Sequence, residues 1–207
     1  QVEDEPWQVA YLPIDPRDLG RDYQAVIRVN SQSGKGGVAF VLERDYGLTL
    51  PRWMQVELAQ IVQRESENHS GEISGERIHQ LFLQHFADAR HPLALIGYRL
   101  DRREGIDLIE AQIDDAGRVS TLRGSGEGAI EAFVDAWTAA YGNRVNVVDY
   151  SEHAIGSGTT ADAVAYVQLS IDGRRVAGAA FDRDTVSASM RAVLAAMNRA
   201  LLTRAAA

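Results

Sequence analysis

The sequence contains no cysteine among its 207 residues and only five prolines. Without cysteine, neither disulfides nor thiolate metal sites can form; this is typical of a reducing compartment, and we expect a cytoplasmic protein. Long apolar runs are also absent, because no stretch approaches the ~20 residues that a membrane-spanning helix requires. The cleanest apolar segment, residues 192–197, lies between Arg191 and the polar pair Asn198 and Arg199. We therefore expect no insertion into a membrane.

Positive charge is scarce as well, with 21 Lys and Arg residues against 29 Asp and Glu residues and a formal net charge of -8. Non-specific binding to nucleic acid depends on clustered basic residues that neutralise phosphates, so nucleic acid is not an expected partner. Residues 1–5 are polar and carry no signal-peptide pattern. We expect them to belong to a linker tail, residues 1–13, and the chain to be a piece of a longer protein.

Residues 14–90 predict a small helical subdomain. Gly47 suits the end of one helix, Pro51 the first turn of the next, and Ser74 the N-cap of a third. The polar stretch 64–71 between the second and third helices predicts a loop. Apolar residues at helical spacing are expected to form the core of this subdomain: Trp53, Met54, Leu58, Ile61, Val62, Ile78, Leu81, Phe82 and Phe86.

Residues 91–207 show a different pattern, in which short strands and turns precede a helix, and this order occurs twice. Strands are expected at residues 95–103, 106–114 and 119–123, and again at 145–150, 163–171 and 175–181. Helices are expected from about residue 130 to the stop at Gly142, and from 186 to 202. The sequence therefore predicts an α+β fold: a helical linker subdomain followed by two tandem βββα units, about 93–142 and 143–204.

Two polar motifs invite a catalytic or nucleotide-binding interpretation. The segment 31–37, Ser-Gln-Ser-Gly-Lys-Gly-Gly, lacks the flanking residues of a phosphate-binding loop, so a turn at a helix start is the better interpretation. The segment 149–153, Asp-Tyr-Ser-Glu-His, has no further metal ligands at fixed spacing. Its Ser and His also lack a Gly-x-Ser-x-Gly elbow, because residues 156–158 read Gly-Ser-Gly. From the residues alone we favour Asp149 and His153 as groups that anchor a loop through hydrogen bonds.

The glycine-rich segment 124–128 directly precedes a predicted helix. Glycines allow close approach of a ligand to the backbone, and the N–H groups at a helix start favour a carboxylate. A flexible strand-to-helix turn is the alternative interpretation. Glu127 lies in the same turn, where its charge would either repel a ligand carboxylate or pair with a ligand ammonium group.

Several stretches taken together resemble the α-isopropylmalate synthases. Residues 13–21 and 25–39 resemble the C-terminal linker subdomain of these enzymes. The segments that resemble their regulatory domain are Asp149-Tyr150, Glu152-His153-Ala154, Gly158, residues 163–167, Ala188-Ser189, residues 191–193 and Asn198-Arg199. The similarity extends from Trp7 to Leu201.

The resemblance implies a function. Members of this family condense acetyl-CoA with 2-oxoisovalerate on a metal-dependent TIM barrel, in the committed step of leucine synthesis. Their C-terminal domain of two βββα units dimerises and binds L-leucine as a feedback inhibitor. The divalent metal and the catalytic residues belong to the barrel, so we expect no cofactor, metal site or catalytic residue in this chain. The expected partners are leucine or a similar branched amino acid, a second copy of the chain, and the barrel of the parent chain.

The resemblance also implies which residues line the effector pocket: Gly126, Gly128, Ala129, Ile130, Val147, Tyr150, Ala154, Ala161, Ala163 and Thr185. Two segments depart from the family pattern. Residues 126–129 read Gly-Glu-Gly-Ala where the family has Gly-Asn-Gly-Pro, and 177–180 read Ala-Gly-Ala-Ala where it has Trp-Gly-Val-Gly. Two alternatives therefore stay open: a citramalate or related synthase domain that senses another amino acid, and a dimerisation module without an effector.

Overall fold

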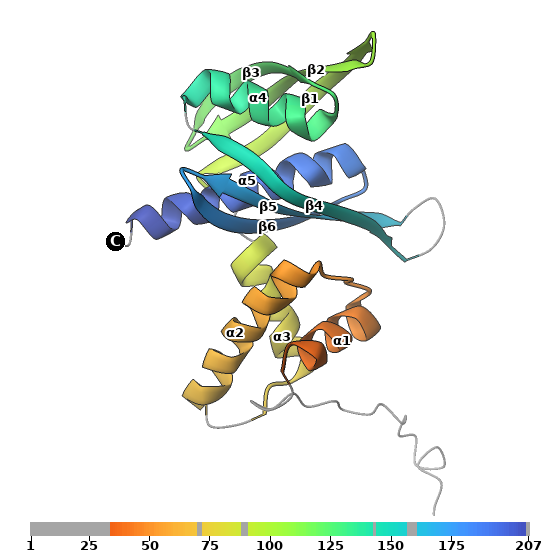
Figure 1. Cartoon of the computed structure of the whole chain (residues 1–207), viewed down its shortest axis with the longest axis vertical. Coiled ribbons are helices and arrows are strands. Elements are labelled where there is room, and N and C mark those ends of the chain that lie inside the picture. The colour runs from red at the N-terminus through yellow and green to blue at the C-terminus, as the bar shows by residue number, and fades with distance from the viewer. Residues whose placement is uncertain (1–33, 70–71, 88–90, 143, 157–160, 206–207) are drawn as a thin grey trace, which may run out of the picture.

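The computed structural model describes residues 34–69, 72–87, 91–142, 144–156 and 161–205. It confirms the α+β fold, in which a cluster of helices is followed by two three-stranded antiparallel sheets, each with a helix after its third strand (Figure 1). The expected tail, 1–13, and the first part of the expected linker subdomain lie outside the described residues.

The helical subdomain consists of α1 (Gly34–Tyr46), α2 (Arg52–His69), α3 (Gly75–Phe82) and a π-helical turn, η2 (Leu83–Ala87). Gly47 follows α1 with a φ of 67°, and the Ser74 side chain accepts the N–H of Arg77 at the start of α3, as predicted. The predicted loop at 64–71 is wrong for residues 64–69, which continue α2. Glu65 is held there by Arg77 at 2.6 Å, and Ser66 is buried.

The predicted core of this subdomain is confirmed for eight of its nine residues, which are buried: Met54, Leu58, Ile61, Val62, Ile78, Leu81, Phe82 and Phe86. Trp53 is only partly buried at the edge of the same cluster. Its indole N–H donates to Asp149, on a strand far along the sequence. The polar end of this side chain therefore needs a position at the surface of the core.

The first βββα unit contains β1 (Leu93–Arg103), β2 (Ile106–Asp115), β3 (Arg118–Gly126) and α4 (Ala129–Tyr141). The second contains β4 (Val145–Ile155), β5 (Asp162–Ile171), β6 (Arg174–Asp182) and α5 (Thr185–Ala205). Three tight turns pair a non-glycine residue at positive φ with a following glycine, the arrangement typical of two-residue hairpins. These pairs are Glu104-Gly105, Ala116-Gly117 and Asp172-Gly173.

The repeat extends to the register of the strands. The first two strands of each unit pair with the same offset and the same register shift, so that Tyr98 lies opposite Ala111 in one unit and Tyr150 opposite Val167 in the other. The helices begin alike, because Ala132 N–H donates to Gly128 and Ala188 N–H to Asp184. Tyr98 therefore corresponds to Tyr150, and Gly128 to Asp184, although the two units were recognised from pattern alone.

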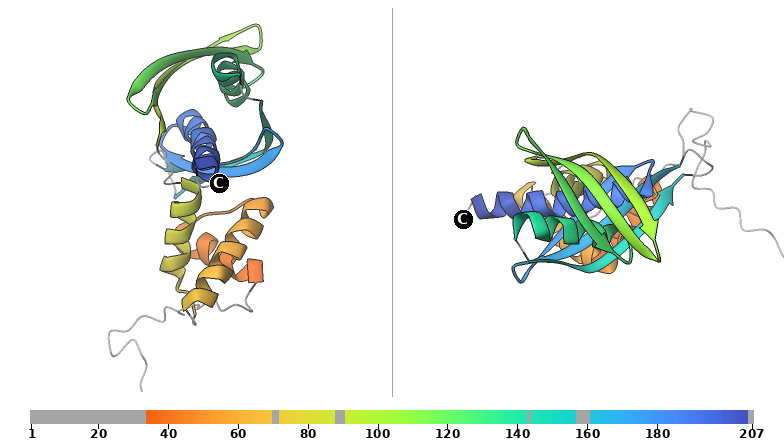
Figure 2. Two further views of the ribbon diagram at one scale, coloured as in Figure 1. Left: turned by 90° about the vertical axis from the view of Figure 1, so that its left-hand side faces the viewer. Right: turned by 90° about the horizontal axis from the view of Figure 1, so that it is seen from above.

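Both helices lie between the two sheets (Figure 2). One glycine in each unit permits this close packing. A Cβ at Gly124 would lie 2.4 Å from the Ala132 carbonyl oxygen of α4, and one at Gly178 would lie 2.3 Å from the Ala192 carbonyl oxygen of α5. Such contacts are with backbone atoms that cannot turn aside, so only glycine fits at these two positions of β3 and β6.

The two sheets differ in what covers their other faces. The second sheet packs on the helical subdomain, and four of its residues belong to the helical core: Val164, Tyr166, Ala177 and Ala179. The Phe82 ring meets Tyr166 and Phe181 edge-on, with ring centroids 6.4 Å apart in both pairs. Both faces of the second sheet are therefore covered, one by α5 and the other by the helical subdomain. In the first sheet, Leu108 and Val119 on the outer face remain exposed.

Candidate functional site

Four of the ten predicted effector residues lie at the start of α4. Gly126 ends β3, so the interpretation of 124–128 as a turn is wrong for residues 124–126, which belong to the strand. A Cβ at Gly126 would lie 2.5 Å from the Ala132 nitrogen, which makes this glycine necessary for helix packing. Gly128 is the N-cap, with extended backbone and no side-chain cap, and Ala129 and Ile130 begin the helix.

Two glutamates, Glu127 and Glu131, lie at this helix start. The N–H of Glu127 donates to the Glu131 carboxylate at 2.8 Å, so one backbone donor of the turn already meets a carboxylate of the protein. A Cβ at Gly128, by contrast, would meet no atom within 4 Å. The space beside the α4 N-cap is therefore open, whereas the space beside Gly126 is filled by α4 itself.

Three predicted residues, Val147, Tyr150 and Ala154, lie on β4. The Tyr150 hydroxyl lies 2.8 Å from Ser189 Oγ and is also hydrogen-bonded to the Glu152 carboxylate. Burial and this carboxylate raise the pKa of Tyr150. Ser189 in turn donates to the carbonyl oxygen of Thr185, at 2.7 Å. These contacts bring Tyr150 and Thr185 together at the start of α5.

Of the remaining predicted residues, Ala161 directly precedes β5 and Ala163 lies near its beginning. Ala163 pairs with Ala154 across the two strands and is buried, with 8% exposure, in the core between the sheets. Ile130 and Tyr150 also pack against that core. Gly158, which carried part of the resemblance, lies outside the described residues. The structure thus places Ile130, Tyr150 and Ala163 in or against one core, and the joint role of the ten residues in binding stays a prediction.

The start of α5 carries a polar cluster that sequence reasoning missed. The Asp184 carboxylate accepts hydrogen bonds from the Ser187 N–H at 3.0 Å, the Ser187 hydroxyl at 2.8 Å and the Tyr98 hydroxyl at 2.5 Å. Burial alone would raise the pKa of Asp184, but these hydrogen bonds lower it. Burial and the bond to Asp184 raise the pKa of Tyr98 to about 12. An Asp directly before a helix was the available signal.

Asp149 and His153 connect β4 to the helical subdomain. Asp149 accepts the indole N–H of Trp53 at 3.0 Å. His153 Nε2 lies 3.0 Å from the Gly47 carbonyl oxygen, and its ring stacks on Tyr166. The interpretation of these residues as hydrogen-bonded anchors is confirmed. They stand on a strand, however, because β4 runs to Ile155 instead of ending at residue 150.

The glycine-rich motif at residues 31–37 and the possibilities of a metal site and a membrane span can also be compared with the structure. Residues 34–37 of the glycine-rich motif begin α1, which agrees with a helix-start turn, while 31–33 lie outside the described residues. Within the described ranges, no three His, Asp or Glu side chains gather in a way that could hold a metal ion. No helix in the same part of the chain is long and apolar enough to cross a membrane.

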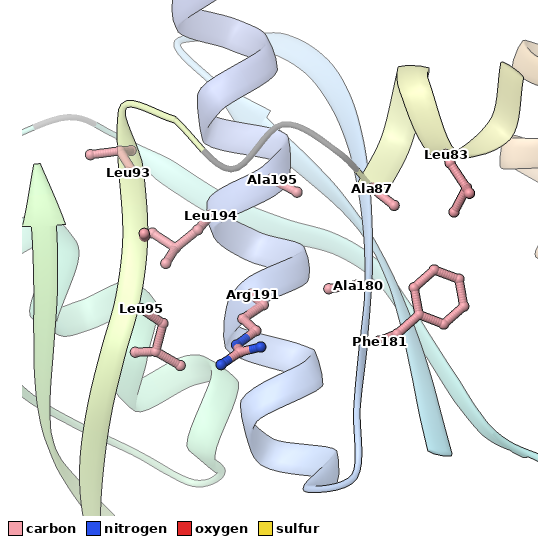
Figure 3. Close-up of a pocket in the computed structure, with 10 residues that line it drawn as sticks. Leu83, Ala87, Leu93, Leu95, Ala180, Phe181, Arg191, Leu194 and Ala195 are labelled. Atoms are coloured by element: carbon pink, nitrogen blue, oxygen red, sulfur yellow. The ribbon is translucent and has the colours of Figure 1, made fainter. Parts of the chain in front are cut away.

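A cavity of about 380 Å³ opens elsewhere, where β1, β6, α5 and η2 meet (Figure 3). Among the described residues that line it, every side chain is apolar except that of one arginine. The lining residues are Leu83, Ala87, Leu93, Ala94, Leu95, Ala180, Phe181, Arg191, Leu194 and Ala195. None of the ten predicted effector residues is among them.

Comparison with known proteins gives a consistent family assignment. Residues 72–201 match the LeuA allosteric (dimerisation) domain, and residues 1–43 match the α-isopropylmalate synthase post-catalytic domain-like family. The 2-isopropylmalate synthase of Pseudomonas syringae pv. tomato is 48% identical over 202 residues, which cover 97% of this chain and 36% of that protein.

The 2-isopropylmalate synthase of Azotobacter vinelandii is 47% identical over 196 residues, covering 94% of this chain and 34% of that protein. The chain thus spans about a third of the length of the curated relatives that it matches. With a helical subdomain, two βββα units and a family match over most of its length, the chain belongs to the LeuA allosteric (dimerisation) domain family.

Proposed function

We propose that this chain is the regulatory and dimerisation portion of a 2-isopropylmalate synthase, and that L-leucine binds to it as feedback inhibitor of leucine biosynthesis. The family match and the names of the relatives support this assignment. In this proposal the condensation of acetyl-CoA with 2-oxoisovalerate, and the divalent metal that it needs, belong to the barrel of the parent chain. The chain itself holds no cofactor and acts in the cytoplasm.

The observation that carries the proposal is the difference between the two helix starts. At α5, the Asp184 carboxylate occupies the helix N-terminus and accepts the Tyr98 hydroxyl. At α4, the corresponding residue is Gly128, which has no side chain, and the tyrosine that corresponds to Tyr98 is Tyr150. A helix N-terminus favours an anion. The carboxylate of a bound amino acid would therefore take at α4 the place that Asp184 takes at α5.

The side chain of the ligand is the second part of the proposal. Ile130, Val147 and the small residues Ala154, Ala161 and Ala163 would form an apolar wall that leaves room for a branched side chain. Calorimetric titration of the 207-residue chain with leucine, isoleucine and valine tests this directly. Leucine is expected to bind at millimolar concentration or below, and binding of another amino acid alone would favour the citramalate-type alternative.

A substitution at Gly128 tests the position of the ligand carboxylate. Gly128→Asp copies the α5 arrangement onto α4 and is expected to abolish leucine binding, because the new carboxylate would occupy the site of the ligand's own. The backbone there is extended, with φ of -150°, and has open space around a Cβ, so the variant should fold. Gly128→Ala is the matched control and should retain binding. Unchanged binding to Gly128→Asp would refute the proposed site.

Two further variants address the pocket. If Glu127 pairs with the ligand ammonium, Glu127→Gln should weaken leucine binding, and if it repels the ligand carboxylate the same change should strengthen it. Ala163→Phe should abolish binding and leave the dimer intact. Because Ala163 is buried in the core, circular dichroism must first show that this variant folds.

Dimerisation is tested separately from effector binding. We expect sedimentation at tens of micromolar to give a homodimer formed through residues 93–204, and a monomer would contradict this. A dimer that binds no amino acid would support the alternative of a dimerisation module without an effector. Turnover of acetyl-CoA and 2-oxoisovalerate by the isolated chain, above a buffer blank, would contradict the assignment of catalysis to the barrel.

A further inference from the structure

The cavity between β1, β6, α5 and η2 has the composition of a small-molecule site. Its volume of about 380 Å³ lies within the range of ligand pockets, roughly 300–1,000 Å³. Of the ten described residues that line it, nine are Leu, Ala or Phe, and the tenth is Arg191. Figure 3 shows the Arg191 guanidinium between Leu95 of β1 and Phe181 of β6. A chamber lined by apolar side chains and one guanidinium group fits an aliphatic molecule that carries one negative charge.

The position of Arg191 is fixed on one side. Its Nη1 lies 2.9 Å from Asp182 Oδ2, and the other oxygen of Asp182 accepts the Asp184 N–H at 3.0 Å. The Arg191 side chain is nevertheless 48% exposed. A guanidinium has five N–H donors in a planar fork, so one ion pair leaves donors for a second carboxylate.

Among the described residues, no acidic side chain lines the cavity. Asp182 lies beside it, but its carboxylate already pairs with Arg191 and accepts the Asp184 N–H. The ammonium group of an amino acid would have to compete with Arg191 for this carboxylate, whereas a carboxylic acid without an amino group would not. The site therefore favours an aliphatic carboxylate that lacks the amine.

The repeat explains why a cavity exists at this place. Leu93 and Leu95 of β1 correspond to Val145 and Val147 of β4, because each pair has the same register against its neighbouring strand. The cavity therefore lies beside β1 at the place that corresponds to Val147 of the proposed leucine site on β4. The two places differ in charge. Arg191 on α5 stands where α4 has Asp135, which accepts the Ser125 N–H at 3.0 Å.

We propose that this cavity is a second binding site, distinct from the leucine site, and that it takes a short branched aliphatic monocarboxylate whose carboxylate binds Arg191. The site touches η2, both sheets and α5, so a ligand there contacts the helical subdomain and both βββα units at once. The inference does not depend on leucine binding and can hold if the module has no amino-acid effector.

The probe is 4-methylpentanoate, titrated into the 207-residue chain by calorimetry and followed by amide chemical shifts in NMR spectra. We expect binding, with the largest shifts at residues 93–95, 180–181 and 191–195. Arg191→Gln should weaken it by about tenfold or more, because a charge-assisted hydrogen bond is lost. Arg191→Lys, which keeps the charge, should recover part of the affinity. The uncharged 4-methylpentan-1-ol should bind weakly and equally to the wild type and to Arg191→Gln.

Two steric and positional controls separate this site from the leucine site. Ala94→Phe fills the cavity from a partly exposed strand position and should abolish binding of 4-methylpentanoate while leucine binding persists. Gly128→Asp should leave 4-methylpentanoate binding unchanged. The proposal is overturned if the probe does not bind, if neither Arg191→Gln nor Ala94→Phe weakens it, or if leucine displaces it competitively. Thermal unfolding followed by circular dichroism establishes that each variant is folded before it is compared.

Discussion

The two βββα units share strand order, register and hairpin turns, yet their middle strands face different surroundings. In β5, Val164 and Tyr166 face the helical subdomain and are fully buried, while Ala165 and Val167 face α5. In β2, the residues that correspond to Val164 and Tyr166 are Leu108 and Glu110, and both are at least partly exposed. A repeat can therefore preserve its backbone while the side chains on one face of a single strand differ, so that the face is exposed in one unit and buried against a neighbour in the other.

The same contrast extends to polar anchors. Asp149 and His153 of β4 bind the helical subdomain, whereas the corresponding residues of β1 are Gly97 and Asp101. On α5, Arg199 adds an ion pair to Glu57 at 2.8 Å and lies over the Phe86 ring. Three side chains of the second unit thus bind the helical subdomain. The two on β4 are replaced in β1 by different residue types, Gly97 and Asp101.

The largest effect on stability is expected when Tyr166 and the corresponding residue Glu110 are exchanged. Tyr166→Glu places a charge where Tyr166 is fully buried against Phe82, and we expect the free energy of unfolding to fall by about 4 kcal/mol or more. The reverse exchange, Glu110→Tyr, is at a partly exposed position paired with Arg123, and should change stability by about 1 kcal/mol at most. Urea unfolding measures both, and equal costs would mean that the two faces do not differ as described.

A smaller effect on stability is expected from a substitution at the start of α5. Asp184→Ala removes the cap of α5 and the acceptor of Tyr98, and should lower the free energy of unfolding by about 1 kcal/mol. Because the folded pKa of Asp184 is lowered, its contribution is present above the unfolded value, about 3.9, and disappears as the pH falls through the folded pKa. Unfolding curves of wild type and variant should therefore converge in acid. A difference that persists below the folded pKa would show that the charge of Asp184 is not the cause.

The smallest effect concerns the Tyr166 hydroxyl. Within the part of the chain that the structure describes, this hydroxyl is buried without a hydrogen-bond partner, and burial raises the pKa of Tyr166. Tyr166→Phe removes an unsatisfied polar group and keeps the ring contacts with Phe82 and His153. We expect stability to stay constant or to rise by about 1 kcal/mol. A clear loss in urea unfolding would indicate that the hydroxyl has a partner.

Local signals in the sequence predicted most of the elements correctly. These signals act through nearby backbone atoms, so the neighbouring residues suffice to predict their effect. Examples are Gly47, Ser74 and the Asp172-Gly173 turn. The continuation of α2 beyond Arg64 depends instead on Arg77, which holds Glu65 from another helix. The polar composition of that stretch indicated a loop because its partner was not yet placed.

The candidate sites were predicted less completely, because their parts are far apart in the sequence. Tyr98 and Asp184 are 86 positions apart, and nothing in the local pattern joins them. The cavity lined by Leu83, Leu95 and Arg191 likewise combines three elements whose packing is a tertiary property. The uninterrupted apolar run of β5 was a usable signal that both faces of that strand are covered.

The pleat of β4 gives the strand two opposed sets of contacts. Tyr150 points to Ser189 on α5, and its neighbour Asp149 points the other way, to Trp53 in the helical subdomain. Consecutive side chains of a strand point to opposite faces, so a single peptide bond separates a residue that contacts α5 from one that contacts the helical subdomain. The two bodies that β4 joins are therefore linked here by one short stretch of backbone.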